Sequence, residues 1–516
     1  MRRNKVDNIQ ELLVSLNSRV EALEKSLEEI KKEVKQCITS IEDLNRRVIE
    51  LEKREGVYPY PEYALCTVNE VDIRGKTVLL IADLDVPYTD RPHIKFIRFA
   101  ETVKEIIERG AKVIVLAYQG VAPTSLPWGT PREKGFDGHI NAIRETIERH
   151  YTAGQCNIVE ISSIRGLLDD STRNYIINIK EGRERVNVLL LGNFVIYCGE
   201  ELLIKDPRNY QDAVLVKDYS KLLDAYVLDN LEVAIKHSLL STGLVQGFAE
   251  KRKPCLVGRS LMREIEILES FRRKLEEYRI KGGRVLIIGG ARPHKAATLI
   301  ETLLTRSLFD KVLTGGYVGL ALVDCTEGSN TLIRGMIATA LLNEGVSDYE
   351  KEMELLQDIL QKFKGLVMYP KDVAFKDGQT RKSLPVGPML RGRAIEAGDI
   401  GDETINAYKK ELERSTIVFF CGVLGKYQDR IFAKGSSCLL DFLLKKQEEG
   451  IEVAIAGKHL TSVLQTLVKS SKYSGELPFA FRNGFASLHV LAGELAPGLE
   501  ALSQICKNSK LSNDQV

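Results

Sequence analysis

The stretch Arg284-Val-Leu-Ile-Ile-Gly-Gly-Ala-Arg292 decides the fold class of this chain. Four consecutive apolar residues follow Arg284, and two glycines come directly after them. A continuous apolar run of this kind predicts a strand of a parallel sheet that helices cover on both faces. Glycine at the carboxyl end of such a strand is typical of the edge at which open α/β sheets bind ligands, often with a phosphate at the next helix N-terminus.

The same pattern recurs along the chain from about Lys76 onward, where short apolar runs alternate with helical stretches. The predicted strands are 77–82, 112–117, 186–191, 225–228, 284–288, 311–314, 416–420 and 452–455. Several of them lead into glycine, namely Gly120, Gly192, Gly315, Gly316, Gly422 and Gly457. One such glycine alone is an ordinary turn residue, but its repetition around two sheets favours a ligand cleft. The alternation predicts an α/β fold with two Rossmann-like parallel-sheet domains.

A long helical pattern over 261–278 divides this body into two halves of similar size. We expect it to form a hinge helix between the two domains. The expected organisation is a coiled coil over 1–55, a linker with the start of the first domain over 56–75, an N-terminal α/β domain over 76–258, an interdomain helix over 259–278, a C-terminal α/β domain over 279–490 and a C-terminal segment over 491–516.

The first fifty residues carry a strict heptad pattern, in which a second apolar position follows the first by three residues. The first set is Leu13, Val20, Leu27, Val34, Ile41 and Val48, and the second is Ile9, Leu16, Leu23, Ile30, Cys37, Leu44 and Leu51. Because the first set is mostly β-branched and the second mostly leucine, we expect a parallel two-stranded coiled coil over 9–51 and a homo-oligomer. The alternative is a single amphipathic helix on its own globule, which normally shows a wider apolar stripe.

The composition argues against several classes of protein. The 73 basic and 71 acidic residues give a net charge of +2, so we expect neither nucleic acid nor a membrane surface as a partner. No apolar run approaches the length of a transmembrane helix, about 18 residues. Nine cysteines without a C-x-x-C pair predict reduced thiols in a cytoplasmic protein, and neither a disulfide framework nor a zinc ribbon. His237, His294 and His459 lack the spacing of metal ligands, so no metal site is predicted.

Seven segments, spread in order from about residue 64 to residue 502, carry a resemblance to a known family. They are 78–87 (VLLIADLDVP), 110–120 (GAKVIVLAYQG), 189–193 (LLLGN), 225–229 (AYVLD), 287–292 (IIGGAR), 433–435 (AKG) and 486–488 (ASL) with 497–498 (PG). In content and order they resemble the phosphoglycerate kinase family. The segment 399–404 (DIGDET), and a histidine at 459 where aspartate is commoner, are more similar to archaeal members.

This resemblance implies a division of labour between the two halves. The N-terminal half would hold 3-phosphoglycerate with a basic patch, and the C-terminal half would hold ATP or ADP with magnesium. Hinge closure would bring the two substrates together, and the last segment of the chain would return to the N-terminal domain. Catalysis would then depend on fixed arginines and lysines that stabilise the transferred phosphoryl group.

Most of these fixed cations are missing from the N-terminal half. The candidate catalytic cation is Lys95, or His93 if the loop is shifted, and the candidate substrate-binding residues are Asp83, Asp85 and Lys236. Asp85 replaces a neutral asparagine of the family and would repel an anionic substrate. Other family arginines and histidines are replaced by Ile81, Tyr118, Val121, Val195 and Ile235. Losing three donors at about 3 kcal/mol each would remove several decades of rate.

The nucleotide half retains more of the family pattern. Its predicted nucleotide-binding residues are Gly289, Gly290, Arg292, Gly315, Gly316, Gln428, Lys458 and Gly484, and Arg292 is also a candidate catalytic cation. The glycine-rich phosphate loops of the family read AGKHL at 456–460 and RNGFA at 482–486. Asn483 and Phe485 place side chains where glycine lets backbone N–H groups approach phosphate. Lys458 and Arg482 are either replacement phosphate ligands or ordinary surface residues.

Three functions therefore remain open. The first is a non-catalytic pseudoenzyme that serves as a coiled-coil-dimerised binding or scaffold protein with a protein partner. The second is an active phosphotransferase that acts on 3-phosphoglycerate or a related acid. The third is a structural component that acts through the coil. Because the losses fall on both substrate sites while the framework persists, the sequence favours the first.

Overall fold

The computed structural model describes residues 60–86, 93–117, 136, 139–150, 157–161, 169–193, 204, 206–471 and 478–513. The predicted coiled coil lies outside the described residues, as do Tyr118, Val121 and Val195. The chain divides into two units, Met1–Tyr60 and Pro61–Val516. The second unit contains the two six-stranded parallel sheets described below. Within the described ranges, no helix combines the length and the apolar character that a bilayer-crossing segment requires.

Six parallel strands form the N-terminal sheet, in the order β3-β4-β2-β1-β5-β6. They are β1 (Thr77–Ala82), β2 (Lys112–Ala117), β3 (Ile158–Ile161), β4 (Val188–Asn193), β5 (Ala225–Asp229) and β6 (Cys255–Val257). Every residue of the central strand β1 is buried. This burial follows from the continuous apolar sequence, because helices exclude water from both faces of the strand.

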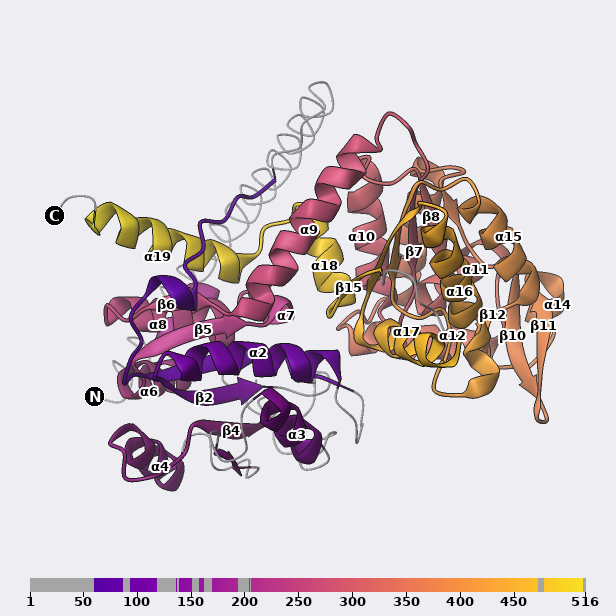
Figure 1. Ribbon diagram of the computed structural model, residues 1–516. Coiled ribbons are helices and arrows are strands. Elements are labelled where there is room, and N and C mark those ends of the chain that lie inside the picture. Colours follow the sequence, from indigo (N-terminus) through magenta and orange to yellow (C-terminus); the bar gives the residue numbers. More distant parts are fainter. Residues whose placement is uncertain are drawn as a thin grey trace, which may run out of the picture. The chain divides into compact units, whose positions relative to one another are not determined.

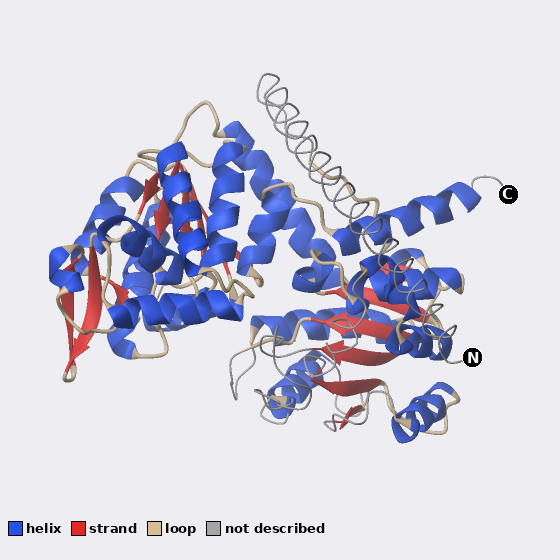
Figure 2. Cartoon of the chain, turned by 180° about the vertical axis from the view of Figure 1, so that it is seen from behind, coloured by secondary structure: helices blue, strands red, loops and turns tan. Residues whose placement is uncertain are grey.

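Helices cover both faces of this sheet (Figure 2). The helices and short helical turns of this half are η1 (Val68–Glu70), α2 (Ile94–Glu108), α3 (Ile140–His150), α4 (Asp170–Lys180), η5 (Pro207–Asp212), α6 (Val214–Leu222), α7 (Leu231–Ala234), η6 (Leu239–Gly243) and α8 (Leu244–Glu250). On one face Leu80 shares a buried cluster with Phe96 of α2 and Ile143 of α3. On the other face the ring of Tyr226 packs against Phe248 of α8, with centroids 5.8 Å apart.

The C-terminal sheet also has six parallel strands, in the order β15-β14-β13-β7-β8-β9. They are β7 (Arg284–Ile288), β8 (Lys311–Thr314), β9 (Val367–Met368), β13 (Ile417–Cys421), β14 (Glu452–Ala456) and β15 (Phe479–Phe481). The expectation of an α/β chain with two parallel sheets is therefore confirmed.

The helices of this half again lie on both faces of the sheet. They are α10 (Pro293–Thr305), α11 (Gly316–Glu327), α12 (Thr331–Asn343), α13 (Tyr349–Lys362), α15 (Asp402–Leu412), α16 (Lys434–Glu448), α17 (Lys458–Ser471) and α18 (Gly484–Leu491). On one face Phe420 of β13 joins a buried cluster with Leu440 of α16 and Leu460 of α17. On the other face Phe419 contacts Phe271, with ring centroids 5.4 Å apart.

A small antiparallel sheet, absent from the sequence prediction, lies at the far end of the C-terminal half (Figure 1). Its order is β11-β10-β12, with β10 (Asp372–Asp377), β11 (Thr380–Pro385) and β12 (Asp399–Ile400). The short helices α14 (Pro388–Arg391) and η7 (Arg430–Phe432) contact its strands. Asp372 fixes this sheet to α15, because its carboxylate accepts hydrogen bonds from the backbone N–H groups of Glu403 (3.0 Å) and Thr404 (2.8 Å).

Two further helices contact elements distant in sequence (Figure 1). Helix α9 (Arg259–Glu277) joins the two sheets along the chain and contacts α2 and β5 on one side and α18 on the other. The last helix, α19 (Pro497–Asn513), packs against β6 and α8 of the N-terminal half.

A disulfide bond joins Cys66 to Cys506, so the expectation that all cysteines are reduced is wrong for this pair. The two residues are 440 positions apart, with Cα atoms separated by 5.7 Å. Two hydrogen bonds join the same two segments of the chain. Ala64 N donates to Ser503 Oγ (2.9 Å), and Ala496 N donates to the hydroxyl of Tyr63 (3.0 Å). No spacing pattern marks this pair in the sequence, because only the docking of α19 brings the two cysteines together.

Candidate functional site

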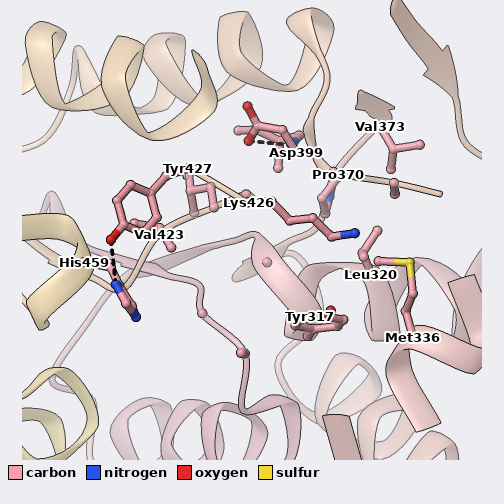
Figure 3. A pocket seen from close by; sticks show the side chains of 18 of the residues that line it. Tyr317, Leu320, Met336, Pro370, Val373, Asp399, Val423, Lys426, Tyr427 and His459 are labelled. Carbon is pink, nitrogen blue, oxygen red and sulfur yellow. Dashed lines mark hydrogen bonds between the residues drawn. The ribbon is translucent and has the colours of Figure 1, made fainter. Parts of the chain in front are cut away.

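A pocket of about 230 Å³ opens at the carboxyl edge of the C-terminal sheet, where the loops after β7, β8, β13 and β14 meet (Figure 3). Its lining is mostly apolar, with a few polar side chains. The lining residues are Gly290, Ala291, Gly316, Tyr317, Leu320, Met336, Pro370, Val373, Ala397, Gly398, Asp399, Ile400, Val423, Leu424, Gly425, Lys426, Tyr427, Gln428 and His459. This is the edge at which open α/β sheets generally hold their ligands.

Glycines allow these loops to approach one another closely. A Cβ atom at Gly289 would lie 2.4 Å from the carbonyl oxygen of Val423, and one at Gly316 would lie 2.6 Å from the backbone of Gly290. Gly315 is similarly enclosed, because its Cβ would lie 2.7 Å from the side chain of Leu424. Gly289 and Gly315 therefore hold the loops together, whereas Gly290 and Gly316 also line the pocket.

One wall of the pocket carries a tyrosine–histidine pair. The hydroxyl of Tyr427 and Nδ1 of His459 are 2.8 Å apart (Figure 3). Burial, and then the neighbouring Lys458, lowers the pKa of His459 to about 4. The ring is therefore neutral near pH 7 and adds no charge to the pocket.

The acidic and the basic side chain of the lining, Asp399 and Lys426, have partners of their own. Asp399 Oδ2 accepts a hydrogen bond from the backbone N–H of Gly435 at 2.7 Å, and Oδ1 accepts one from Ile400 at 2.9 Å. Burial raises the pKa of Asp399 to about 7 despite these bonds. The ammonium group of Lys426 donates to Glu396 at 3.2 Å. The pocket thus has little net charge.

At the carboxyl edge of the N-terminal sheet, Lys95 takes part in a buried network of three side chains. Its Nζ donates to Asp83 Oδ1 at 2.6 Å and to Asn483 Oδ1 at 3.3 Å. The amide of Asn483 in turn donates to Asp83 Oδ2 at 3.0 Å. Burial alone would raise the pKa of Asp83, but Lys95 and Arg482 outweigh it and hold that pKa below its usual range. Lys95, from α2, is therefore engaged by its own chain.

Two more cations of the loops in the C-terminal half are paired in the same way. Lys458, the first residue of α17, donates to Asp85 Oδ2 at 2.6 Å, and the loop after β1 supplies that carboxylate. Arg482 lies before α18 and pairs with Glu264 of α9, with contacts of 3.0 Å from Nε and 2.9 Å from Nη2. The backbone N–H of Arg482 also donates to Glu264 at 3.2 Å.

A fourth carboxylate, Glu232 of α7, lies near the remaining predicted cations, Arg292 and Lys236. Arg292 donates to it at 3.1 Å, and the ammonium nitrogen of Lys236 lies 3.7 Å away. Burial alone would raise the pKa of Glu232, but Arg292 and Lys236 outweigh it and hold that pKa below its usual range. Burial lowers the pKa of the nearby Lys295 to about 8, although the charge of Glu232 acts in the opposite direction.

The predicted site residues thus separate into two groups in the structure. Gly290, Gly316 and Gln428 line the pocket, whereas Gly289 and Gly315 pack behind it. The predicted charged residues belong to the paired clusters around Asp83, Asp85 and Glu232. Gly484 packs against Cys421, where a Cβ would lie 3.0 Å from the sulfur atom. Within the described residues, no three or more His, Cys, Asp or Glu side chains gather in a way that could hold a metal ion.

Sequence reasoning missed most of the pocket wall. Tyr317, Leu320 and Met336 lie on α11 and α12, where apolar residues look like ordinary core. Pro370 and Val373 belong to the small antiparallel sheet or its approach, which was not predicted. His459 was not predicted as a ligand-binding residue, although it lies two residues after a strand-ending glycine, in a loop that resembles a phosphate loop of the family.

Comparisons with known proteins identify relatives of one family along most of the chain. The family model described as "Phosphoglycerate kinase" matches residues 68–494. The phosphoglycerate kinase of Methanopyrus kandleri is 26% identical over 449 aligned residues, which cover 85% of this chain and 97% of that protein. The phosphoglycerate kinase of Pyrococcus horikoshii is 27% identical over 452 residues, covering 84% and 96%.

Two solved structures share the fold. The crystal structure of phosphoglycerate kinase from Pyrococcus horikoshii has a TM-score of 0.64 at 23% identity, covering 86% of this chain and 100% of that one. The structure of the enzyme from Coxiella burnetii has a TM-score of 0.53 at 16% identity, covering 85% and 99%.

Proposed function

The chain belongs to the phosphoglycerate kinase family, and we propose that it is a non-catalytic member that acts as a binding or scaffold protein. The resemblance predicted from its motifs is confirmed, with archaeal homologues at about 26% identity. One observation carries the proposal: the cations that stand at the family's substrate positions are paired with carboxylates of this chain. Phosphoryl transfer requires such cations to meet the charge that develops on the phosphoryl oxygens.

The residues present do not fit a magnesium-bound triphosphate, which is what the family uses. Lys458 is paired with Asp85 at 2.6 Å, and Arg292 with Glu232 at 3.1 Å. At the start of α18, Asn483 is engaged with Asp83, and Phe485 replaces a glycine of the family pattern. Each pair would have to open before a phosphate could take its place.

An active phosphotransferase is the second candidate. Lys95, Lys458 and Arg482 remain cationic at the cleft, and they would support that function if a substrate could displace their carboxylate partners. A structural role through the coil is the third. Location in the cytoplasm is part of the proposal, because the family's enzymes act there.

An assay of phosphoryl transfer tests the proposal. Purified full-length protein is expected to convert 3-phosphoglycerate and ATP, with magnesium, at the rate of a variant that carries both Lys458→Ala and Arg292→Ala, two partly exposed positions. The physical reason is that Lys95, Arg292 and Lys458 are each paired with a carboxylate of the chain, and each lost donor costs about 3 kcal/mol of transition-state stabilisation. A rate well above this control, abolished by the double substitution, would support the active phosphotransferase instead.

Self-association through the heptad region is expected in the same protein. Burying the apolar seam over 9–51 between two parallel helices stabilises a dimer, whereas the seam of a lone helix would stay in water. Light scattering after size-exclusion chromatography should therefore give a dimer for the full chain and a monomer for a truncated chain that starts at Gly56. A monomeric full chain would mean that the helix binds a different protein or its own body.

A further inference from the structure

We propose that the pocket selects an uncharged, nucleoside-type ligand over the corresponding nucleotide, and that Asp85 sets this preference as a built-in anion on Lys458. The inference deepens the proposed binding role and rests on it. Its first support is the pocket itself, which is small and mostly apolar, with backbone of Gly290 and Gly316 on one side and Tyr317, Leu320 and Met336 among its walls. Such a lining fits a flat, uncharged ring system.

The charged groups of the lining do not provide an anion site. Lys426 extends across the pocket toward Pro370 in Figure 3, and its ammonium group pairs with Glu396 at 3.2 Å. His459 is held by Tyr427 at 2.8 Å. The carboxyl group of Asp399 is buried and accepts backbone hydrogen bonds from Gly435 and Ile400, so it offers no donor to a phosphate.

The groups beyond the pocket that would receive a phosphate tail are already occupied by carboxylates. Lys458 directly precedes the lining residue His459 in the chain, and Asp85 lies 2.6 Å from its ammonium nitrogen. At the start of α10, the carboxylate of Glu344 accepts the backbone N–H groups of His294 (2.9 Å) and Lys295 (3.1 Å). A phosphate group would have to displace these internal anions, which act as competitors that are always present.

An aromatic ring adds to this exclusion on the side of α18. A Cβ atom at the lining residue Gly290 would lie only 3.7 Å from the ring of Phe485. Phe485 is the second residue of α18 and places apolar surface next to the pocket. The backbone N–H groups at such a helix start would otherwise favour an anion. An uncharged ligand loses nothing by this arrangement, whereas a phosphate would lose hydration without gaining a donor.

The ion pair between Asp85 and Lys458 is partly exposed, so its charge can be changed with little effect on folding. The side chains of Lys95 and Asp83 are 2% and 1% exposed, so breaking that pair would leave a buried charge. The side chains of Lys458 and Asp85 are 26% and 12% exposed, so water can solvate the remaining partner. Asp85→Asn keeps the shape of the residue and removes only its charge.

Calorimetric titration of the full-length protein with adenosine, AMP, ADP and ATP, with and without magnesium, tests the proposal. The wild type is expected to bind adenosine more tightly than ADP. Asp85→Asn is expected to tighten ADP and AMP binding about tenfold or more, because an ammonium group without a charged partner gains a charge-assisted hydrogen bond to phosphate. Adenosine affinity should stay unchanged in the variant, since adenosine has no group that reaches Lys458.

Two further variants separate this explanation from general electrostatics. Asp85→Asn combined with Lys458→Met should lose the gain, and Glu396→Gln, which removes a carboxylate from Lys426, should not reproduce it. The proposal is overturned if the wild type binds ADP as tightly as adenosine, if adenosine does not bind at millimolar concentration, or if Asp85→Asn brings no gain for ADP. These titrations contain no 3-phosphoglycerate and measure binding alone. The proposed non-catalytic function is tested separately, by the phosphoryl-transfer assay.

Discussion

Glu264→Ala is expected to lower the free energy of unfolding by about 3–5 kcal/mol, the usual effect of removing one partner of a buried ion pair. The side chains of Arg482 and Glu264 are 6% and 5% exposed. Glu264 accepts hydrogen bonds from the backbone N–H (3.2 Å) and Nε (3.0 Å) of Arg482, and Nη2 lies 2.9 Å from its carboxylate. Without the carboxylate, the guanidinium group would be buried with much of its hydrogen bonding lost.

The neighbouring acidic groups do not replace Glu264. Asp83 is engaged by Lys95 at 2.6 Å. Asp229 accepts hydrogen bonds from Thr102 Oγ1 (2.7 Å) and the backbone of Leu261 (2.6 Å), and burial raises its pKa to about 7. Neither carboxyl group can turn toward Arg482 without giving up these bonds, so the cost of the substitution should be close to its full value.

Chemical unfolding of the full-length protein, followed by circular dichroism, measures this cost. Glu276→Ala is a matched control on the same helix, because it breaks a pair with Arg272 in which the glutamate is 52% exposed. That change should alter stability by less than about 1 kcal/mol. The double variant Glu264→Met with Arg482→Met should recover much of the loss, since it leaves no unpaired charge. A Glu264→Ala protein within about 1 kcal/mol of the wild type would contradict the argument.

The sheets were predictable because their strands consist of uninterrupted apolar residues. β1, β2, β7 and β8 begin and end where the pattern placed them, at Thr77–Ala82, Lys112–Ala117, Arg284–Ile288 and Lys311–Thr314. The strands that escaped prediction are short or mixed in character. β9 has only two residues, and β11 (Thr380–Pro385) is largely exposed and polar, so neither produces an apolar run.

The candidate site was predictable mainly where glycine marks the end of a strand, and at Gln428 through the family resemblance. Gly290 and Gly316 line the pocket for this reason. The partners of the cations carried no such signal. Glu232 and Glu264 lie on helices α7 and α9, where a glutamate is indistinguishable from a surface residue until the fold brings it within 3.1 Å of an arginine.

Asp85 illustrates how the structure changes the interpretation of a single substitution. In the sequence it appears as a charge that would repel an anionic substrate. In the structure the same carboxylate binds Lys458 at 2.6 Å, across 373 residues of chain. The aspartate that replaces the family's asparagine at position 85 and the lysine at position 458 therefore form one ion pair. This pairing agrees with a site whose charged groups bind one another.

Loss of the disulfide bond between Cys66 and Cys506 is expected to destabilise the protein by about 4–6 kcal/mol in the chain-entropy description. The bond closes a loop of 440 residues, and the entropy that it removes from the unfolded chain grows with loop length. In the folded protein it holds the segment after Tyr63 against α19, where Ala64 bonds to Ser503. Cys506 is buried, so its thiol would gain little from water on reduction.

Thermal and chemical unfolding of three proteins, each with and without dithiothreitol, tests this expectation. A Cys66→Ser, Cys506→Ser double variant should unfold like the reduced wild type, and the reductant should not change it further. Cys438→Ser is the matched control, because it removes a half-buried thiol that has no disulfide partner. Peptide mapping of the unreduced wild type should recover the fragment that links residues 66 and 506. If dithiothreitol leaves the unfolding of the wild type unchanged while that linked fragment is present, the bond does not stabilise the fold, because the order that it imposes on the unfolded chain would then be supplied by other contacts.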